Sequence, residues 1–453
     1  MSKFPKTALE EFVEGSVDLS PEESKVIVDE SNVNAAEVES RMRQVRRLSD
    51  VRAVLEDLAV VATRIERASP TELRLIESAS DMAAAGTSIA PQNFVPAVEQ
   101  YLGKRISTES WTDKAKQILK VLLDHMAAIW EKLEDFFKLA FIIPNIQKGI
   151  KSRLDWMRRM EDPEKVKTTV QINSQVSSLR VGGLLGKDPQ NPSLLTLAHI
   201  ETNAENYTKI LEYVYEDYLK ASVIKGADIY NSIKSFDLKA PEKEILRLTE
   251  KLRLHDPDIP PGAKTKPAIR LKDKTLFTGS ESLEFFGDNY LILARYEPEN
   301  KQDADDALRQ AKRTKVTLEH AQRASPQDIS NTTTMSRLKP DEIKSILKIA
   351  SEYLGKLQDF YIGREYKAVR EIRRDVEKAC KEAVNELDNL RDSTRDMAGP
   401  DFEKYFRALI DLNPTFAGWI QSPAVDMYRR TISIVQTLLI VADAQLATYQ
   451  SKQ

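Results

Sequence analysis

The chain has 453 residues, of which 41% are hydrophobic and 30% are charged, and its formal net charge is −3 at pH 7. The length is sufficient for two or three domains, and the balance of hydrophobic and charged residues is typical of a helix-rich soluble protein and excludes a wholly disordered chain. The 15 glycines are few for an all-β fold with many turns. A single cysteine, Cys380, excludes a disulfide framework within the chain and fits a reducing compartment such as a cytosol.

The first quarter of the chain differs in charge from the rest. Residues 1–109 hold 13 Lys and Arg against 19 Asp and Glu, a balance of −6, whereas the remainder holds 54 against 51, a balance of +3. All four tryptophans lie in the remainder, and the N-terminus has no apolar core typical of a secretory signal. Two interpretations stay open: a solvated N-terminal arm, or a detachable segment that masks a basic or adhesive surface.

Helical patterns follow an acidic start that has no sustained period. Residues 34–68 carry apolar residues at three- and four-residue steps, and shorter helices are expected over 69–85 and 93–102. A longer stripe then begins after Ser110, which with Asp113 resembles a capping box. Its apolar positions are Trp111, Ile118, Leu122, Met126, Ile129, Leu133 and Phe136. We expect this stripe to pack in the core of the chain, with a partner helix as the alternative. Its most apolar run is too short to span a membrane.

The segment "NIQKGIKSRLDWMRRM" continues helically and is basic. Five of its residues are candidate DNA contacts: Lys148, Lys151, Arg153, Arg158 and Arg159. A second basic stretch covers residues 364–374. Because the net charge after residue 109 is only +3, we expect at most weak contact with DNA, and a salt-bridged helix surface is the preferred interpretation of both stretches.

The second half of the chain contains a short β region between helices. Alternation within 165–181 indicates a strand in part, and helices are expected over 193–236 and 241–253. Residues 268–296 predict a small β meander or a set of hairpins, with a turn at Thr278-Gly279-Ser280 and Gly-Asp-Asn leading into "YLILARY". The segment "RTKVTLEHA" adds a candidate strand. Helices are then expected over residues 340–390, 401–411 and 424–449.

Motifs that carry chemistry are not found. "VGGLLGKDP" resembles a phosphate loop, but Gly182 is one residue too close to Gly186, and Asp188 stands where Ser or Thr is required, so a glycine turn is preferred to nucleotide binding. The four histidines are isolated, and Cys380 lacks a CxxC partner. We therefore predict no catalytic, cofactor-binding or metal-binding residue and a non-enzymatic protein, while a site assembled from distant residues stays open.

Three segments carry a resemblance to a known family. "ISTESWTDKAKQILKVLLDHMAAIWEKLEDFFKL", "KTLFTGSESLEFFGDNYLIL" and "LKPDEIKSILKIASEYLGKLQDF" are similar in character and placement to segments of the internal head proteins of giant tailed bacteriophages. In that family an acidic propeptide ends in a Ser/Ala/Gly-x-Glu tripeptide. An amphipathic helix with spaced Trp and Phe then begins the mature protein.

The resemblance implies a structural virion protein that is packaged inside the head and is matured by a phage protease. Cleavage is expected after Glu109, in Ser107-Thr108-Glu109 before Ser110, or after Glu99, in Ala97-Val98-Glu99. The tripeptide occurs five times up to residue 109 and five times afterwards, so the polar stretch before a helix cap is what favours Glu109. The cut would remove a charge of −6 and leave a body of +3 that tolerates dense DNA.

The expected fold class is mainly α, with long amphipathic helices in a bundle, a small antiparallel β segment of minor α+β character and the acidic propeptide-like region. The expected divisions are a propeptide-like region (1–109), a helical body (110–260), a β-containing segment (261–330) and a C-terminal helical region (331–453). The implied partners are capsid and other head proteins, the maturation protease and, weakly, packaged DNA. The implied location is the virion interior, after assembly in the bacterial cytoplasm, with ejection alongside DNA as a further possibility. The competing hypothesis is an unprocessed cytosolic helical scaffold.

Overall fold

The computed structural model describes residues 142–451, except 163–167, 173–175, 187, 189–190, 192, 236–242, 245–246, 248–259, 271–275, 298–314, 322–332, 364–365, 377, 380–381 and 383–399. From Ile143 onward the described residues belong to one compact unit of the chain. The helices expected before residue 142 and the domain boundary expected at residue 109 lie outside the described residues.

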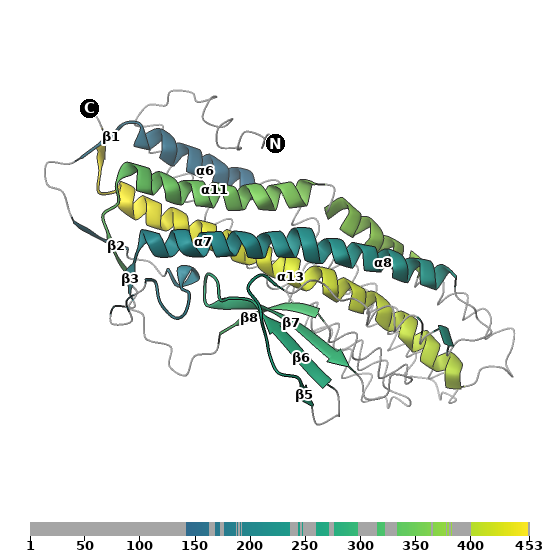
Figure 1. Cartoon of the computed structure of the whole chain (residues 1–453). Coiled ribbons are helices and arrows are strands. Elements are labelled where there is room, and N and C mark those ends of the chain that lie inside the picture. The colour runs from purple at the N-terminus through teal and green to yellow at the C-terminus, as the bar shows by residue number, and fades with distance from the viewer. Residues whose placement is uncertain are drawn as a thin grey trace, which may run out of the picture. The chain divides into compact units, whose positions relative to one another are not determined.

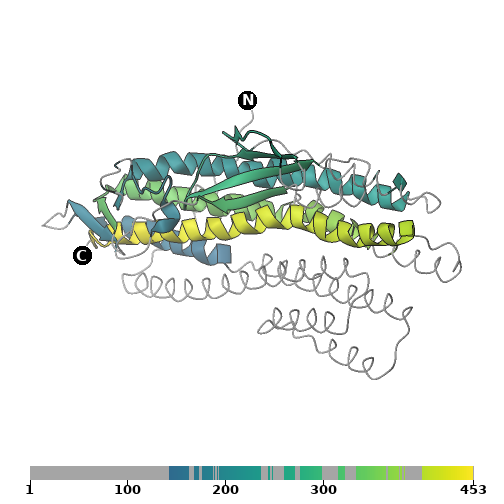
Figure 2. The ribbon, with the colours of Figure 1, turned by 90° about the horizontal axis from the view of Figure 1, so that it is seen from below.

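Helices predominate in the part of the chain that the structure describes, which confirms a mainly α fold with a small antiparallel sheet. They are α6 (Ile142–Met157), α7 (Leu197–Glu212), α8 (Leu219–Lys234), α11 (Pro340–Ile362) and α13 (Pro400–Leu446). Figures 1 and 2 show α7 and α8 following one another along one line, with α11 and α13 running alongside them and α6 beside α11. Pro144 falls in the first turn of α6, where its missing N–H has no helical partner to lose.

Helices α7 and α8 are joined without a break by η2, a π-helix over Tyr213–Tyr218. The helix predicted over 193–236 is thus largely confirmed. It begins later than predicted, because Leu194–Leu195 form strand β3 and Thr196 caps α7 by accepting a hydrogen bond from the amide of His199 at 3.2 Å.

Helix α11 packs antiparallel to α13 and forms much of the core with it. Its first turn is fixed by Pro340 and by Glu342, whose carboxylate accepts the amide of Lys339 at 2.6 Å. Along its buried face, Ile346, Leu354 and Leu357 are inaccessible to solvent, as expected for apolar residues repeating every three or four positions.

The prediction of two separate helices at the end of the chain is wrong, because α13 is continuous. Residues 401–411 and 424–449 are expected to form separate helices. Pro414 and Pro423 lie between these two ranges, and proline usually interrupts a helix. The backbone instead forms one helix of 47 residues. Its second part is buried against α11, η2 and the sheet, and this burial offsets the loss of one backbone hydrogen bond at each proline.

The main sheet has five strands and is antiparallel, as the meander pattern predicts. The strands are β4 (Lys264–Thr265), β5 (Ile269–Arg270), β6 (Leu276–Glu281), β7 (Asn289–Glu297) and β8 (Lys315–His320). The central strands β6 and β7 pair in register, and β8 pairs with the other edge of β7. The strand expected in "RTKVTLEHA" is therefore confirmed as β8, which also packs on α13 (Figure 2).

The turn expected at Thr278-Gly279-Ser280 is wrong, because these residues lie inside β6. Gly279 pairs with Ala294 in the β6–β7 ladder. A Cβ at Gly279 would lie 3.1 Å from the ring of Phe277, which packs on Tyr296 with ring centroids 5.1 Å apart. The glycine therefore gives room to an aromatic pair on the sheet and does not reverse the chain.

Two smaller sheets lie near the C-terminal end of α13. One pairs β1 (Met160–Glu161) with β10 (Gln450–Ser451), and the other joins β2 (Thr169–Ile172), β9 (Thr333–Ser336) and β3. Strand β2 confirms the partial strand expected within residues 165–181. Most of the helix expected over residues 241–253 lies outside the described residues.

Candidate functional site

The glycine segment that resembles a phosphate loop forms a tight turn between Val181 and Leu184. Gly182 and Gly183 have φ angles of 69° and 78°, and the flanking residues exchange backbone hydrogen bonds of 3.0 and 3.2 Å. Positive φ at both central positions is the geometry of a type I′ turn, which glycine adopts without steric strain. The preferred interpretation, a glycine turn, is therefore confirmed.

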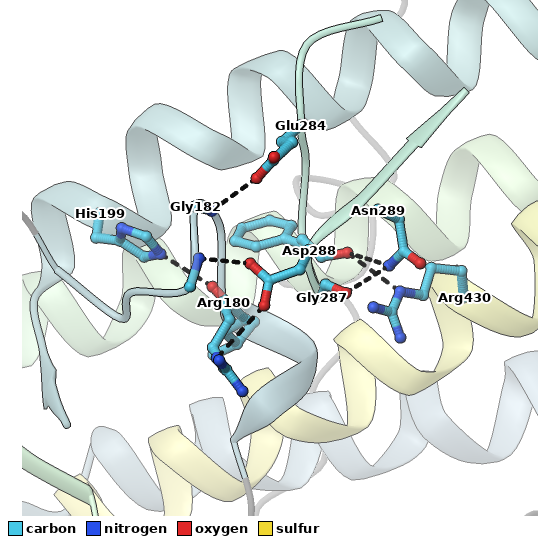
Figure 3. Close-up of polar contacts among 11 residues, drawn as sticks. Arg180, Gly182, His199, Glu284, Gly287, Asp288, Asn289 and Arg430 are labelled. Atoms are coloured by element: carbon cyan, nitrogen blue, oxygen red, sulfur yellow. Dashed lines mark hydrogen bonds and ion pairs between the residues drawn. The ribbon is translucent and has the colours of Figure 1, made fainter. Parts of the chain in front are cut away.

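The amides of this turn bind two carboxylates of the same chain (Figure 3). The Gly183 amide donates to Oδ1 of Asp288 at 2.7 Å, and the Gly182 amide donates to Oε2 of Glu284 at 3.0 Å. Adjacent backbone N–H groups at such a turn form an anion-binding concavity. Here the anions come from the loop between β6 and β7, so internal carboxylates are bound where a phosphate loop would hold phosphate.

The loop from Phe285 to Asn289 is shaped to reach this turn. Gly287 and Asp288 have φ angles of 78° and 53°, and the amides of both donate to the carbonyl of Arg180, at 2.6 and 3.0 Å. Asp tolerates the left-handed conformation better than most residues because its short polar side chain bonds locally. The Asn289 side chain donates to the carbonyls of Phe286 and Gly287 at 2.9 Å each, which fixes the loop.

The charge of Arg180 stabilises the carboxylate of Asp288 at the glycine turn. The Asp288 carboxylate, whose side chain is 5% exposed, lies 3.5 Å from Nε of Arg180. Nearby, the ring of His199 bonds the carbonyl of Leu179 at 2.9 Å, so its Nε2 carries the proton and donates. Burial lowers the pKa of His199, while the Leu179 hydrogen bond and the charge of Asp288 act in the opposite direction. The imidazole is therefore neutral at physiological pH.

Two phenylalanines anchor the loop in the helical core. Phe285 and Phe286 are fully buried, and their ring centroids lie 5.4 and 6.0 Å from that of Tyr207 on α7. The Tyr207 ring also contacts Tyr353 of α11 at 5.1 Å, and its hydroxyl lies 2.8 Å from that of Thr431 on α13. Full burial of each phenylalanine contributes about 1.5–3 kcal/mol, so these rings connect the sheet to three helices.

Arg430 of α13 also contacts the loop from Phe285 to Asn289. Its Nε donates to the carbonyl of Phe286 at 3.1 Å, and burial lowers the pKa of its guanidinium, which remains charged. A Cβ at Gly287 would lie 1.1 Å from a terminal nitrogen of Arg430. Only glycine fits between the loop and this side chain.

These contacts define a structural junction between the sheet and the helices and do not define a reaction centre. The sequence identified Gly182 and the Gly-Asp-Asn turn, but it did not predict their partnership, since Gly183 and Asp288 are 105 residues apart. The paired phenylalanines beside a positive-φ turn were the only local signal of an anchored loop. Among the described residues, no group of three or more His, Cys, Asp or Glu is arranged to hold a metal ion.

The predicted basic residues of α6 occupy different environments. Lys148 and Arg158 are exposed, Lys151 and Arg159 are half-buried, and Arg158 pairs with Asp155 at 3.2 Å. Arg153 is 6% exposed. Its Nε and one terminal nitrogen each lie 2.6 Å from the Asp443 carboxylate on α13, and its other terminal nitrogen donates to the Gly149 carbonyl. Arg153 therefore joins two helices, and we leave it out of any DNA-binding proposal.

The other predicted residues lie outside the described part of the chain. These are the cleavage tripeptides, Ala97-Val98-Glu99 and Ser107-Thr108-Glu109 with Ser110, and the stripe from Trp111 to Phe136. In the described part, no helix is both long enough and apolar enough to cross a membrane.

Comparison with known proteins identifies the class to which the chain belongs. A family model for phiKZ-like phage internal head proteins matches residues 23–444. The chain therefore belongs to the family of phiKZ-like phage internal head proteins, which confirms the resemblance noted in its sequence. No curated protein and no solved structure matches the chain. As an internal head protein, it is located inside the phage capsid and is assembled in the host cytoplasm.

Proposed function

We propose that the chain is a structural, non-catalytic component of the phage head that is matured by proteolysis before Ser110 or Gln100. In this proposal a phage protease removes the acidic segment, and the remaining body stays with the packaged DNA and other head proteins. Membership of the internal head protein family carries the proposal, and the charge difference between residues 1–109 and the rest gives the cleavage a physical purpose.

The structure of the body supports selective cleavage. Three of its Ser/Ala/Gly-x-Glu tripeptides are described, and they end at Glu281, Glu284 and Glu352. Glu281 ends strand β6 and pairs with Lys266, and Glu284 accepts the Gly182 amide, while Glu352 lies in the middle of helix α11. Because proteases cut exposed, extended segments, cleavage at these positions would require local unfolding of the body.

Weak DNA contact is the second part of the proposal. Exposed Lys148 and Arg158 lie ten residues apart on or just after α6, and Lys151 and Arg159 are half-buried beside them. Each phosphate contact by Lys or Arg releases condensed counterions, so binding should weaken steeply with salt. A low net charge and the engagement of Arg153 within the chain favour weak contact that depends on the high DNA concentration of a filled head.

The decisive experiment is to determine the N-terminus and intact mass of the protein purified from phage particles. We expect a chain that begins at Ser110 or at Gln100. A virion form that still begins at its original N-terminus would contradict the processing proposal while leaving membership of the family unaffected.

Infection with isotopically labelled phage particles tests whether the protein is ejected with the DNA. If the mature body is delivered with DNA, it should be found in infected cells before new protein synthesis begins, when the particles carry an isotopic label. Label that stays with emptied particles would show that the protein is retained in the head.

A further inference from the structure

A cleft lies where the π-helix η2 faces α11 and the helical residues 366–376. Its volume is about 660 Å³, and its apolar lining includes Leu211, Tyr215, Leu219, Phe360 and Val369. Tyr215 and Phe360 form part of its floor with ring centroids 4.4 Å apart. Insertions of the π type often mark functional positions in helices, because the wider turn displaces side chains from the regular α pattern.

Charged side chains surround this apolar floor and are predominantly acidic. Four carboxylates line the cleft, those of Glu212, Glu216, Asp217 and Asp359, against two ammonium groups, those of Lys220 and Lys356, which gives a formal balance of −2. Lys356 is paired with Glu212 at 2.7 Å. Within the described residues, no ion-pair partner is found for Glu216, Asp217 or Asp359.

An exposed apolar side chain extends the surface beyond the cleft. Ile224 of α8 is 60% exposed and lies one helical turn after Lys220, next to Val223, which lines the cleft. An apolar centre within a charged rim is the usual anatomy of a protein–protein interface. A closed small-molecule pocket would not require an exposed isoleucine at its edge.

We propose that this cleft, together with Ile224, is a docking site for a segment of another head protein that presents an apolar side chain between Lys or Arg residues. The apolar anchor would enter against Tyr215 and Phe360, and the flanking cations would pair with Glu216, Asp217 and Asp359. The uncompensated carboxylates select a basic partner, because burying them against a neutral or acidic one would leave them unpaired. All residues of this site belong to the described body.

Site-directed photo-crosslinking in phage particles tests the proposal. A photoreactive phenylalanine analogue replaces Ile224 in the full-length chain, and the same analogue at Ile440, which is 37% exposed on α13, is the control. We expect crosslinking from position 224 only, to a segment of another head protein whose sequence, mapped by mass spectrometry, contains an apolar residue flanked by Lys or Arg.

Charge reversal then separates a specific site from chance proximity. The double change Glu216→Lys and Asp217→Lys should lower the crosslinking yield at least tenfold, whereas Glu205→Lys and Glu371→Lys, on exposed helix surfaces, should leave it unchanged. Replacing the captured Lys or Arg residues by Glu should restore the yield with the reversed cleft. Unaltered thermal unfolding of each variant establishes that the body is intact.

Each other outcome overturns the proposal. Crosslinking to a second copy of this chain would make the surface a self-association interface, and crosslinking to DNA would make it a nucleic-acid contact. Capture of an acidic or neutral segment, insensitivity to charge reversal, or equal yields at positions 224 and 440 would show that the cleft selects no basic partner.

Discussion

At the scale of single residues, the best-defined positions are those of the junction between the glycine turn and the β6–β7 loop. Its glycines are required for two different reasons. Gly182 and Gly183 supply the backbone angles of a turn whose amides bind carboxylates, whereas Gly287 leaves the space that Arg430 occupies. The consequences of substitution can therefore be predicted one position at a time.

Replacing Gly287 by alanine should be strongly destabilising. The new Cβ would overlap the Arg430 guanidinium and would also place a side chain at a φ of 78°. Strain and displacement of Arg430 together should lower the free energy of unfolding by about 2–4 kcal/mol, measured by urea denaturation. Gly355→Ala is the matched control, since nothing lies within 4 Å of its Cβ position in α11. It should raise stability by about 0.5–1 kcal/mol, and equal effects of the two changes would refute the steric argument.

The neutral His199 predicts a stability that depends on pH. Its pKa is lowered in the folded state, mainly by burial, so the unfolded chain takes up the proton first as the pH falls below the ordinary value of 6.5. The contribution of this residue is therefore fully present above pH 6.5 and is lost as the pH falls through the lower, folded-state pKa.

The variant His199→Gln isolates this effect from that of the carboxylates. Its amide can still donate to the Leu179 carbonyl, but it does not titrate. The difference in unfolding free energy between the parent and the variant should shrink or change sign as the pH falls below 6.5. A difference that is constant across this range would mean that the histidine does not titrate on unfolding.

At the scale of elements, α13 organises the described part of the chain. It contacts α11, η2, α8 and the sheet. At the junction its Arg430 donates to the Phe286 carbonyl, and the hydroxyl of its Thr431 is hydrogen-bonded to that of Tyr207. Helix α6 is attached to α13 near the C-terminal end of α13 through Arg153 and Asp443. Each attachment joins segments that are far apart in sequence, so the loss of one should loosen a whole element.

The pair of Arg153 and Asp443 gives a direct test of how α6 is held. Asp443→Ala leaves a nearly buried guanidinium with only the Gly149 carbonyl, and should cost about 2–3 kcal/mol, a value reduced because Asp443 is 43% exposed. Arg153→Met keeps the packing and removes the charge. A double-mutant cycle should therefore give a coupling energy of about 1–2 kcal/mol, whereas additive effects would show that the pair contributes little.

At the scale of the whole molecule, the family assignment and the charge distribution together favour a protein in two functional parts. The described body holds its potential cleavage tripeptides in a strand, in a hydrogen-bonded loop and in a helix. Protection by folding, rather than the rarity of the tripeptide, would then decide where the protease cuts.

Substitution of the cleavage glutamates tests this view. Glu109→Gln should block removal of residues 1–109 in phage particles, shifting the product to Gln100 or to the full length, as measured by intact mass. Glu352→Gln changes another tripeptide of the same pattern, Ala350-Ser351-Glu352 within α11, and should leave the virion product unchanged. A fragment that ends at Glu281, Glu284 or Glu352 in normal particles would show that the folded body is not protected.

The sequence was sufficient for features that depend on neighbouring residues. The apolar periodicity of residues 340–362 predicts α11, the alternation around "YLILARY" predicts β7, and paired glycines predict a turn at Gly182. It was misleading where a local signal was overridden. Gly279 suggested a turn although it lies within a paired strand, and residues 401–411 and 424–449 were predicted as separate helices although both belong to α13.

The sequence by itself thus determined the helical class, the order of most elements in the described body and the resemblance to phage internal head proteins. Only the tertiary structure decided which carboxylates the glycine turn binds, that Arg153 pairs with Asp443 on another helix, and that α13 is continuous. The physical reason is range. Periodicity and turn chemistry act over a few residues, whereas the contacts between Gly183 and Asp288 and between Arg153 and Asp443 join positions 105 and 290 residues apart, which only folding brings together.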